Sequence, residues 1–538
     1  MHHHHPGLPI LVIGAGPTGL SLAITLRRFG VPVRIVDRAA QPSGVSKALA
    51  VWSGSLEALE GMQAIEPFLA EGQRLRAVCV GHGRRRLATL AVGDGIDSPY
   101  PYPLLLAQSR TEEILTARLA ALGVAVERQV EATGLAQDEG GVTVVLRHAN
   151  GRHEDVRTPY AIGADGARSF VRQALGVAFE GYTEPQTFLL CDAKIGGGTL
   201  DHRSIYLWWR DGGTVALFPF GADVWRVFAM RDGSKSAEAP ATLEELQDHL
   251  DRHGPGDLRL GDPGWLSVFR INERLAARYR VGRCFLAGDA AHIHSPAGGQ
   301  GMNTGIQDAV NLGWKLAHAA TGRGDGGLLL DSYEAERRPI ARAVVDAAAQ
   351  KLHVAFGASP LRTLVKDIAI SLFGNLPAVQ RKLQVELSET EIVYREGPLV
   401  RLGAPPSRPR RTDVGARACD ATFLEPLTGK SDTLWPFLSA PRHSLLLFED
   451  GQPIMIGGVA EGAGDGLQVL RLDAQSDPGH RVRKRYRLDG PGWVLIRPDQ
   501  VVAARGEATD MDGLAAYIER VLRPTAAAAE RQKSGIAA

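Results

Sequence analysis

The sequence predicts an α/β fold of several domains, in which a parallel-sheet unit contains an inserted antiparallel sheet and precedes a separate C-terminal domain. Three observations predict this arrangement. The chain has 538 residues, and a domain usually takes about 100–200 residues, so about three domains are expected. Residues 8–37 have the pattern strand, glycine turn, helix, strand. Residues 182–230 contain short strand-like runs separated by glycines, which is typical of an antiparallel sheet.

The first unit is a βαβ motif. An apolar run, Ile10–Ile13, leads into the turn Gly14-Ala15-Gly16-Pro17-Thr18-Gly19, a helix, and a second strand that ends at Asp37. Glycines at these spacings let a backbone approach a pyrophosphate at a helix N-terminus, where free N–H groups and the helix dipole favour negative charge. A carboxylate at Asp37 would accept hydrogen bonds from a ribose. The motif therefore predicts a Rossmann-like dinucleotide-binding domain.

A second glycine match does not predict a second such domain. Gly322, Gly324 and Gly327 have the same spacing, but they follow a helix and lead into no strand, turn and helix. We therefore interpret this match as a chance occurrence.

The remaining elements follow from periodicity and turn residues. A helix over 109–122 precedes strands at 124–130, 142–147 and 160–163, and later helices are expected over 303–320 and 331–356. Prolines at 405, 406 and 409 indicate a linker. The predicted divisions are 7–180 and 276–395 for the two parts of the dinucleotide-binding domain with its helices, 181–275 for the antiparallel sheet, 396–413 for the linker, 414–523 for the C-terminal domain, and 524–538 for a tail.

Composition excludes several classes of protein. Lys+Arg 61 against Asp+Glu 60 leaves a net charge of +1, so no nucleic-acid or membrane partner is expected. The four cysteines lie far apart, which predicts neither disulfides nor a structural metal and is typical of a cytoplasmic protein. His292 and His294 lie two positions apart, but no third ligand of suitable spacing accompanies them, so no metal site is predicted.

Two further motifs make the prediction specific. One is Ile162–Arg172, which contains Asp165-Gly166, and the other is Ala287–His292, which contains Gly288-Asp289 and continues through Pro296–Asn303. With the glycine turn, in this order and spacing, they resemble the single-component FAD-dependent aromatic hydroxylases, that is, the para-hydroxybenzoate hydroxylase-like flavoprotein monooxygenases. The resemblance covers residues 8–390. Within this family the chain most resembles the phenol hydroxylase branch, which includes the chlorophenol and polyketide hydroxylases, because a further domain of about the right size follows residue 390.

The resemblance implies a tightly bound, noncovalent FAD. It places Asp165 near the pyrophosphate, Asp289 on ribose or ribitol hydroxyls, Gln108 against FAD, and Lys47 where many relatives have an arginine near the isoalloxazine ring. Arg168 matches the arginine of the Asp165 motif. The expected cofactor-binding residues are Gly14, Gly16, Gly19, Asp37, Arg38, Lys47, Gln108, Asp165, Gly166, Gly288, Asp289, Pro296, Gly299, Gly301, Met302 and Asn303.

The resemblance also implies the reaction. NADPH or NADH would reduce FAD as a transient co-substrate, O₂ would add to give a C4a-hydroperoxyflavin, and one oxygen would pass to a phenolic or polycyclic aromatic substrate. No catalytic residue or base is identified; Pro296, Gly299, Gly301 and Lys47 are expected nearest the flavin. Tyr206 and Trp225 are the candidates for lining the substrate pocket, because aromatic side chains are frequent in the predicted antiparallel sheet.

The C-terminal segment 414–523 resembles the thioredoxin-like domain of the phenol hydroxylase branch. Cys419 is its only thiol, so an internal disulfide cannot form there. The expected role is packing or formation of a homodimer.

Two other functions stay open from the sequence. The scaffold could insert oxygen beside a ketone, as a Baeyer–Villiger enzyme does, because motifs that hold FAD do not fix the acceptor. Lys47 in place of arginine also allows a non-catalytic protein that binds flavin or aromatic compounds. Flavin halogenation is not expected, since the chain contains no W-x-W-x-I-P segment.

Overall fold

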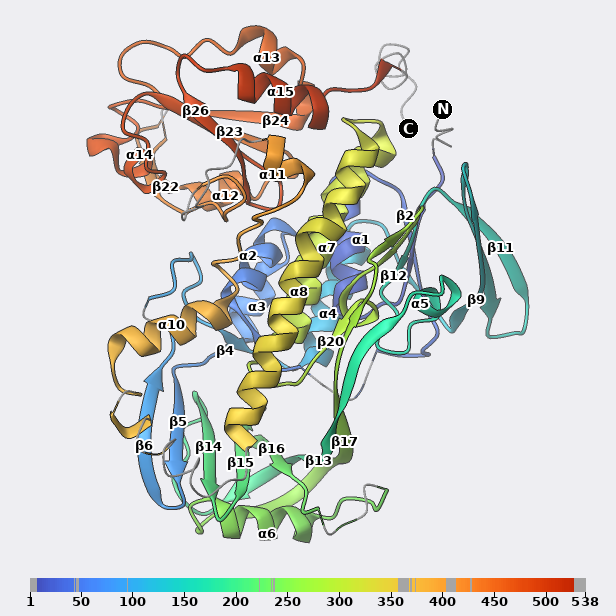
Figure 1. The fold of residues 1–538 in the computed structure, drawn as a ribbon, viewed down its shortest axis with the longest axis vertical. Helices are drawn as coiled ribbons and strands as arrows, with labels where there is room; N and C mark the ends of the chain where they lie inside the picture. The colour runs from blue at the N-terminus through green and yellow to red at the C-terminus, as the bar shows by residue number, and fades with distance from the viewer. Residues whose placement is uncertain are drawn as a thin grey trace.

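The computed structural model describes residues 7–42, 44, 48–93, 95–221, 223–233, 235, 238–356, 367, 370–372, 374–402, 413–425 and 428–526. Figure 1 shows three parts, with the glycine-turn domain in the middle, the large antiparallel sheet at one end and the C-terminal domain at the other. The long helix α8 (Gly326–Phe356) starts beside the C-terminal part and runs past the middle to the antiparallel sheet. Among the described residues, no helix is both long and apolar enough to cross a membrane.

A six-stranded, mostly parallel sheet forms the centre of the first part. Strand β1 pairs in parallel with β2 and β12, and the glycine turn leads from β1 into α1 (Pro17–Arg28). The predicted βαβ unit is confirmed. In sheet order the strands are β18 (Arg280–Val281), β19 (Cys284–Leu286), β12 (Ala161–Gly163), β1 (Ile10–Ile13), β2 (Val33–Asp37) and β8 (Val126–Arg128).

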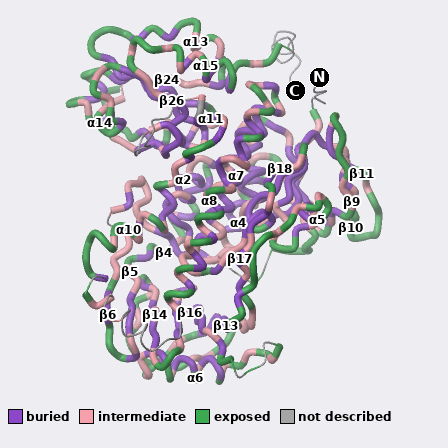
Figure 2. Tube along the Cα trace, in the orientation of Figure 1, coloured by how far each residue is buried: buried purple, intermediate pink, exposed green. Residues whose placement is uncertain are grey.

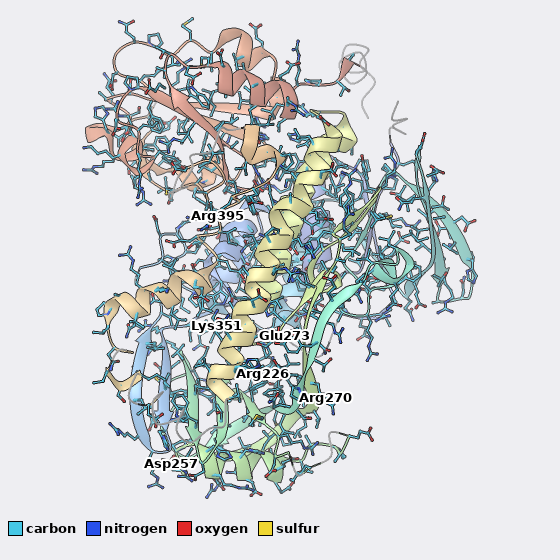
Figure 3. All side chains as sticks on the ribbon, in the orientation of Figure 1. Arg226, Asp257, Arg270, Glu273, Lys351 and Arg395 are labelled. Atoms are coloured by element: carbon cyan, nitrogen blue, oxygen red, sulfur yellow. The ribbon has the colours of Figure 1, made fainter. Side chains whose placement is uncertain are left out.

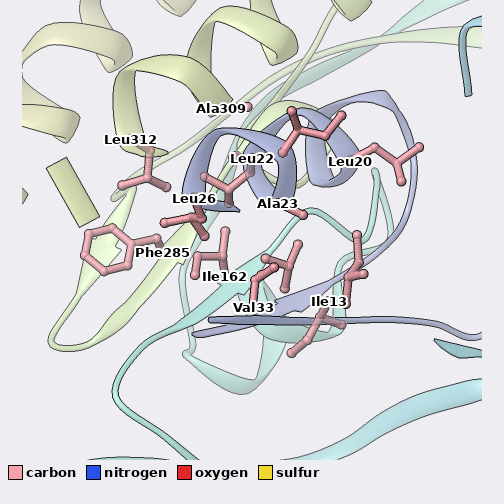
Figure 4. Packing of buried hydrophobic residues seen from close by; sticks show 14 of the residues in the cluster. Ile13, Leu20, Leu22, Ala23, Leu26, Val33, Ile162, Phe285, Ala309 and Leu312 are labelled. Atoms are coloured by element: carbon pink, nitrogen blue, oxygen red, sulfur yellow. The ribbon is translucent and has the colours of Figure 1, made fainter. Parts of the chain in front are cut away.

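Apolar side chains of α1 fill the space between this sheet and helix α7 (Gly301–Thr321), as Figure 4 shows. Leu22 and Leu26 on α1 and Leu312 on α7 are fully buried. Figure 2 shows that buried residues concentrate around these helices, whereas the outer strands and loops are exposed. This core fixes the turn that precedes α1.

Smaller elements surround the central sheet. They are the three-stranded sheets β11 (His153–Thr158), β10 (Gly141–His148), β9 (Val130–Asp138) and β3 (Ala50–Val51), β7 (Leu104–Leu105), β4 (Gln73–Arg74), with helices α2 (Ser53–Gly61), α3 (Ile65–Glu71), α4 (Gln108–Ala121), α5 (Phe170–Ala174), α10 (Pro377–Ser388) and α11 (Pro398–Leu402).

An eight-stranded sheet forms the second part. Its strands in order are β20 (His292–Ile293), β17 (Arg259–Ala276), β13 (Phe179–Gly196), β16 (Val224–Met230), β15 (Gly213–Pro219), β14 (Ser204–Arg210), β5 (Ala77–His82) and β6 (Arg85–Ala91). The expected antiparallel sheet is present, but the segment 181–275 does not contain all of it. Strand β14 pairs in parallel with β5, which brings residues 77–91 of the N-terminal segment into the sheet.

The two faces of this sheet have different neighbours. One, which we call the far face, packs against Leu246 and Leu250 of helix α6 (Leu243–His253). The other, the near face, packs against Leu352 and Phe356 of α8 and against Ala297. The far face comprises Leu189, Cys191, Ala193, Tyr206, Trp208, Val215, Leu217, Trp225, Val227 and Ala229. The near face comprises Phe188, Leu190, Leu207, Ala216, Phe218, Phe228, Met230, Trp265, Phe269 and Ile271.

The C-terminal part contains a four-stranded mixed sheet. Strand β23 pairs in parallel with β24 and antiparallel with β25. Its strands in order are β24 (Leu467–Leu472), β23 (His443–Phe448), β25 (Gly492–Ile496) and β26 (Val502–Glu507). This part also contains the strand pair β21 (Thr422–Leu424) and β22 (Ser431–Thr433). Its helices are α12 (Leu434–Leu438), α13 (Gly457–Glu461), α14 (Arg481–Arg485) and α15 (Asp512–Val521).

Buried ion pairs connect this part to the middle of the molecule. Arg497, in the turn after β25, donates to Glu336 of α8 at 2.7 and 2.8 Å. Arg417 pairs with Glu57 of α2. Breaking either pair would leave an uncompensated buried charge, so the C-terminal part is held against α2 and α8.

Candidate active site

The glycine turn has the conformation that only glycine allows at two of its positions. Gly14 has φ +105°, and a Cβ there would lie 2.3 Å from the Ala164 carbonyl oxygen. A Cβ at Gly19 would lie 1.9 Å from the Gly14 carbonyl oxygen. Beside Gly16, by contrast, no atom lies within 4 Å of such a Cβ. The turn is thus tightly packed on its inner side and open at Gly16, which is where a phosphate group could approach the start of α1.

Asp37 holds this turn against the end of β2. Its Oδ2 accepts a hydrogen bond of 2.7 Å from the Ala15 N–H, and its Oδ1 accepts one of 2.8 Å from the Ala39 N–H. The carboxylate therefore has a structural contact that the sequence did not reveal. Its predicted contact with a ribose stays a prediction, and the neighbouring Arg38 is exposed.

Asp165 lies directly against the glycine turn. A Cβ on Gly14 would come within 2.8 Å of the Asp165 Cα. Its Oδ2 accepts hydrogen bonds from the Phe170 and Val171 N–H groups at 2.7 and 3.2 Å, which caps α5. Its Oδ1 is buried and accepts no hydrogen bond from the described part of the chain, and burial raises the pKa of the carboxyl group. This unsatisfied oxygen fits a hydroxyl donor from a bound cofactor.

The third motif meets the first at Gly288. Gly288 has φ +59°, and a Cβ there would lie 2.4 Å from the Thr18 Oγ1 on α1. Its N–H donates to Asp308 Oδ2 at 3.2 Å, and His292 Nε2 bonds the same oxygen at 2.6 Å. Arg337 donates to Asp308 Oδ1 at 2.7 Å. Asp308, which sequence analysis missed, thereby orients the Gly288-Asp289 turn, and the exposed Asp289 extends from it.

This bonding also explains the histidine pair. His292 is buried and bonded to Asp308, while His294 bonds the Ser295 carbonyl at 2.8 Å. Burial lowers the pKa of His294 to about 4, so its ring is neutral near pH 7. Within the ranges described, no group of three His, Cys, Asp or Glu side chains could hold a metal ion.

The loop before α7 is anchored by Asn303. Its side chain donates to the carbonyls of Ala50 and Gly299 at 2.9 and 2.8 Å, and its Oδ1 accepts from the Trp52 N–H at 2.8 Å. The amide of Asn303 is therefore occupied within the protein. Helix α7 begins at Gly301, so its first N–H groups have no partners inside the helix and can stabilise negative charge in front of it.

The other predicted cofactor residues differ in their hydrogen bonding and in how far they are exposed. Gln108 exchanges hydrogen bonds with Ala48 and donates to Glu112 at 2.8 Å, so its side chain is used inside the protein. Lys47 lies outside the described residues. Arg168 and Pro296 are exposed, and Gly166, Gly299 and Met302 are partly buried.

The two predicted substrate residues lie on the far face. Trp225 is 2% exposed, and Tyr206 is also buried; the Tyr206 hydroxyl oxygen accepts a hydrogen bond of 2.8 Å from the Asp201 N–H. Both pack in the cluster that α6 covers. Because side chains alternate along a strand, these two lie on the opposite side of the sheet from the 296–303 loop, and their contact with a substrate stays a prediction.

The near face contains further aromatic side chains, which were not chosen as pocket candidates from the sequence. Phe188 and Phe228 stack with ring centroids 5.2 Å apart, and Phe269 lies 5.9 Å from Phe228. Arg226, on the same face, makes a bidentate pair with Asp192 at 2.8 Å. Ala297 of the 296–303 loop packs against this face. An apolar aromatic surface therefore adjoins the loop that precedes α7.

A dinucleotide turn, the Asp165-Gly166 and Gly288-Asp289 motifs packed against it and an aromatic sheet face beside a helix N-terminus are the features of an FAD-dependent monooxygenase of aromatic compounds. The chain belongs to this family: residues 7–348 match the FAD binding domain model. It is 34% identical over 537 residues to 6-methylpretetramide 4-monooxygenase of Streptomyces rimosus, covering 95% of this chain and 93% of that protein.

Two further comparisons agree. Rifampicin monooxygenase of Streptomyces venezuelae is 39% identical over 364 residues, covering 67% of this chain and 75% of that protein. The anhydrotetracycline hydroxylase OxyS from Streptomyces rimosus has a similar structure, with a TM-score of 0.77 and 32% identity, covering 96% of this chain and 99% of that one. The predicted family, FAD cofactor and aromatic hydroxylase class are confirmed.

Proposed function

We propose that the substrate is a polycyclic aromatic compound of the polyketide kind, hydroxylated on a ring. The observation that carries this proposal is the near face: Phe188 and Phe228 are buried against Phe356 of α8, whereas Trp265 and Phe269 are only partly buried on the same face, which adjoins the loop before α7. A flat, fused-ring molecule buries the most area against such a surface. Anhydrotetracycline and rifampicin monooxygenases are among the relatives, which supports a large polycyclic substrate.

The proposed FAD site combines the three motifs. Gly14, Gly16 and Gly19 would approach the pyrophosphate, Asp165 would accept a hydroxyl through its unsatisfied Oδ1, and Asp289 would accept ribitol or ribose hydroxyls. The N-terminus of α7 would face negative charge on the reduced ring. FAD supplies the transfer of electrons from NAD(P)H to oxygen; the protein binds it, orients the acceptor and excludes water.

The C-terminal part is proposed to be a thioredoxin-like domain with a structural role. Its four-stranded mixed sheet is compatible with that fold, and Cys419, buried and free, is its only thiol. A homodimer stays a prediction. All four cysteines are free, which supports action in a reducing cytoplasm.

The FAD assignment is tested with Asp289→Ala. Loss of a charged acceptor should weaken FAD binding by about 1.5–3 kcal/mol, roughly 10- to 150-fold. The measurement is titration of apoprotein with FAD, followed by flavin fluorescence. Asp248→Ala, which removes an exposed aspartate on α6, is the matched control and should bind FAD like the wild type. An unchanged FAD affinity in Asp289→Ala would remove Asp289 from the site.

A further inference from the structure

One buried carboxyl group near the aromatic surface has no role in the site described above. Glu273, on β17, is 2% exposed. Its Oε1 accepts a hydrogen bond of 3.1 Å from the Ser295 N–H. Its Oε2 is buried and accepts no hydrogen bond from any residue that the structure describes. A buried carboxylate oxygen without a donor is unfavourable, so this oxygen fits a donor that comes from outside the chain.

The position of Glu273 follows from the alternation along β17. Trp265, Phe269 and Ile271 belong to the near face, and side chains two residues apart on a strand lie on the same side. Glu273 continues this series toward the parallel-sheet part. Its hydrogen bond to Ser295 places it next to the residue that precedes Pro296. Figure 3 shows Glu273 on β17 beside α8. Glu273 therefore lies where the aromatic surface meets the loop before α7.

The surroundings of Glu273 keep its carboxyl group partly protonated near neutral pH. Burial raises its pKa to about 7, with further contributions from the negative charges of Glu184 on β13 and Asp346 on α8. Glu184 is itself buried and bonded by His353 Nε2 at 2.9 Å. Tyr182, opposite Glu273 on β13, has a raised pKa and stays neutral. A carboxylate with these neighbours can accept a proton near neutral pH.

We propose that Glu273 accepts the proton of an acidic ring hydroxyl on the substrate. The inference rests on the proposed function, since it needs an aromatic acceptor on the near face. The substrate O–H bond breaks, a new O–H bond forms on Glu273 Oε2, and the electron pair stays on the substrate oxygen. That pair raises the electron density of the ring carbons that receive the oxygen atom. The substrate class is thereby narrowed to aromatics with a free hydroxyl next to the reacting carbon or across the ring from it.

The first test is Glu273→Gln in the FAD-loaded enzyme, with 1-naphthol and 1-aminonaphthalene as the first pair of acceptors. For 1-naphthol, kcat/KM of the wild type should rise with pH through about 7, because only the ionised carboxylate accepts a proton. Glu273→Gln should lose this rise and fall about 100-fold at pH 8. The amine, whose ring needs no deprotonation, should lose less than about fivefold. Equal losses for the two acceptors would contradict the inference.

Glu184→Gln provides an independent test. Removing its negative charge should lower the pKa of Glu273, so the rise in kcat/KM should move to lower pH with the same plateau. A rise that stays in place or moves upward would count against Glu273. The control is Glu245→Gln on α6, a buried carboxylate that pairs with Arg231 behind the far face. It should change neither the position of the rise nor the plateau.

Failure of the inference can be told from failure of the proposed function. If the wild type turns over hydroxylated aromatics and Glu273→Gln has the same pH profile, only the assignment of Glu273 is wrong. If no aromatic acceptor stimulates NADPH oxidation by the wild type, the proposed substrate class is wrong, and this inference falls with it.

Discussion

The two faces of the eight-stranded sheet are made by the same strands but are covered by different elements. On the far face, Tyr206 and Trp225 are buried in the cluster that α6 covers, where Tyr206 also stacks on Trp208. On the near face, Trp265 and Phe269 are only partly buried, and the nearest other elements are α8 and the loop before α7. Aromatic residues occur on both faces, so their presence alone does not identify a binding surface. What distinguishes the faces is the element that covers each one.

The largest expected effect is on the far face. Trp225→Ala should lower the free energy of unfolding by about 3–5 kcal/mol, because a fully buried indole is removed from a closed core. The KM for the acceptor should not change in the protein that folds. Denaturant unfolding and steady-state kinetics check the two statements. A large rise in KM with normal stability would place Trp225 in the substrate site after all.

The matched change on the near face should affect the KM for the acceptor more than the free energy of unfolding. Phe269→Ala removes a partly buried ring, so the free energy of unfolding should fall by only about 1–2 kcal/mol. The KM for a polycyclic acceptor should rise about tenfold, equivalent to about 1.4 kcal/mol of lost contact. Should Phe269→Ala lose stability as Trp225→Ala does and keep its KM, the two faces would not differ as described.

A smaller effect is expected from Tyr206→Phe. The variant loses only the hydroxyl that accepts from the Asp201 N–H, so stability should fall by about 0.5–1.5 kcal/mol. Acceptor kinetics should stay at the wild-type level, because the hydroxyl belongs to the far face. Thermal unfolding combined with NADPH oxidation assays measures both, and altered kinetics would show that the far face reaches the substrate.

The smallest effect is expected at Cys419, in the C-terminal part and far from both faces of the sheet. Cys419→Ser should leave turnover unchanged, since a single thiol cannot cycle through an internal disulfide. FAD content and steady-state rates test this. Lost turnover in a folded, FAD-loaded variant would indicate thiol chemistry in the C-terminal part.

The glycine turn could be predicted from sequence because its physics is local. Positive φ at Gly14 and the close contact at Gly19 admit no side chain, so the residue types themselves carry the information. Three strands of the large sheet, β14, β15 and β16, were likewise predictable from strand-like runs in the sequence, whereas the long strands β13 and β17 were not predicted. The parallel pairing of β14 with β5 was not, because no local pattern connects residues 204–210 with residues 77–82.

Local sequence patterns also could not show which face of the sheet is closed by a helix. Alternation shows that Trp225 and Phe228 lie on opposite faces, but only the packing of α6 shows which face is closed. Asp308 could have been noticed, since it is a carboxylate within an apolar stretch of a predicted helix. Its partners His292 and Arg337 come from distant segments, so its bonding required the fold. Glu273 could not be identified from the sequence either, because its contact with Ser295 and its neighbour Glu184 depend on the fold.

The rate of reduction of the bound FAD distinguishes an aromatic hydroxylase from the alternative functions. Stopped-flow absorbance would follow reduction by NADPH with and without a panel of phenols, naphthols and polyketide aromatics, and mass spectrometry would identify the products. The account predicts that a hydroxylated polycyclic acceptor accelerates reduction and gains one oxygen atom on its ring. Oxygen inserted beside a ketone, or no reduction of FAD with any acceptor, would contradict it.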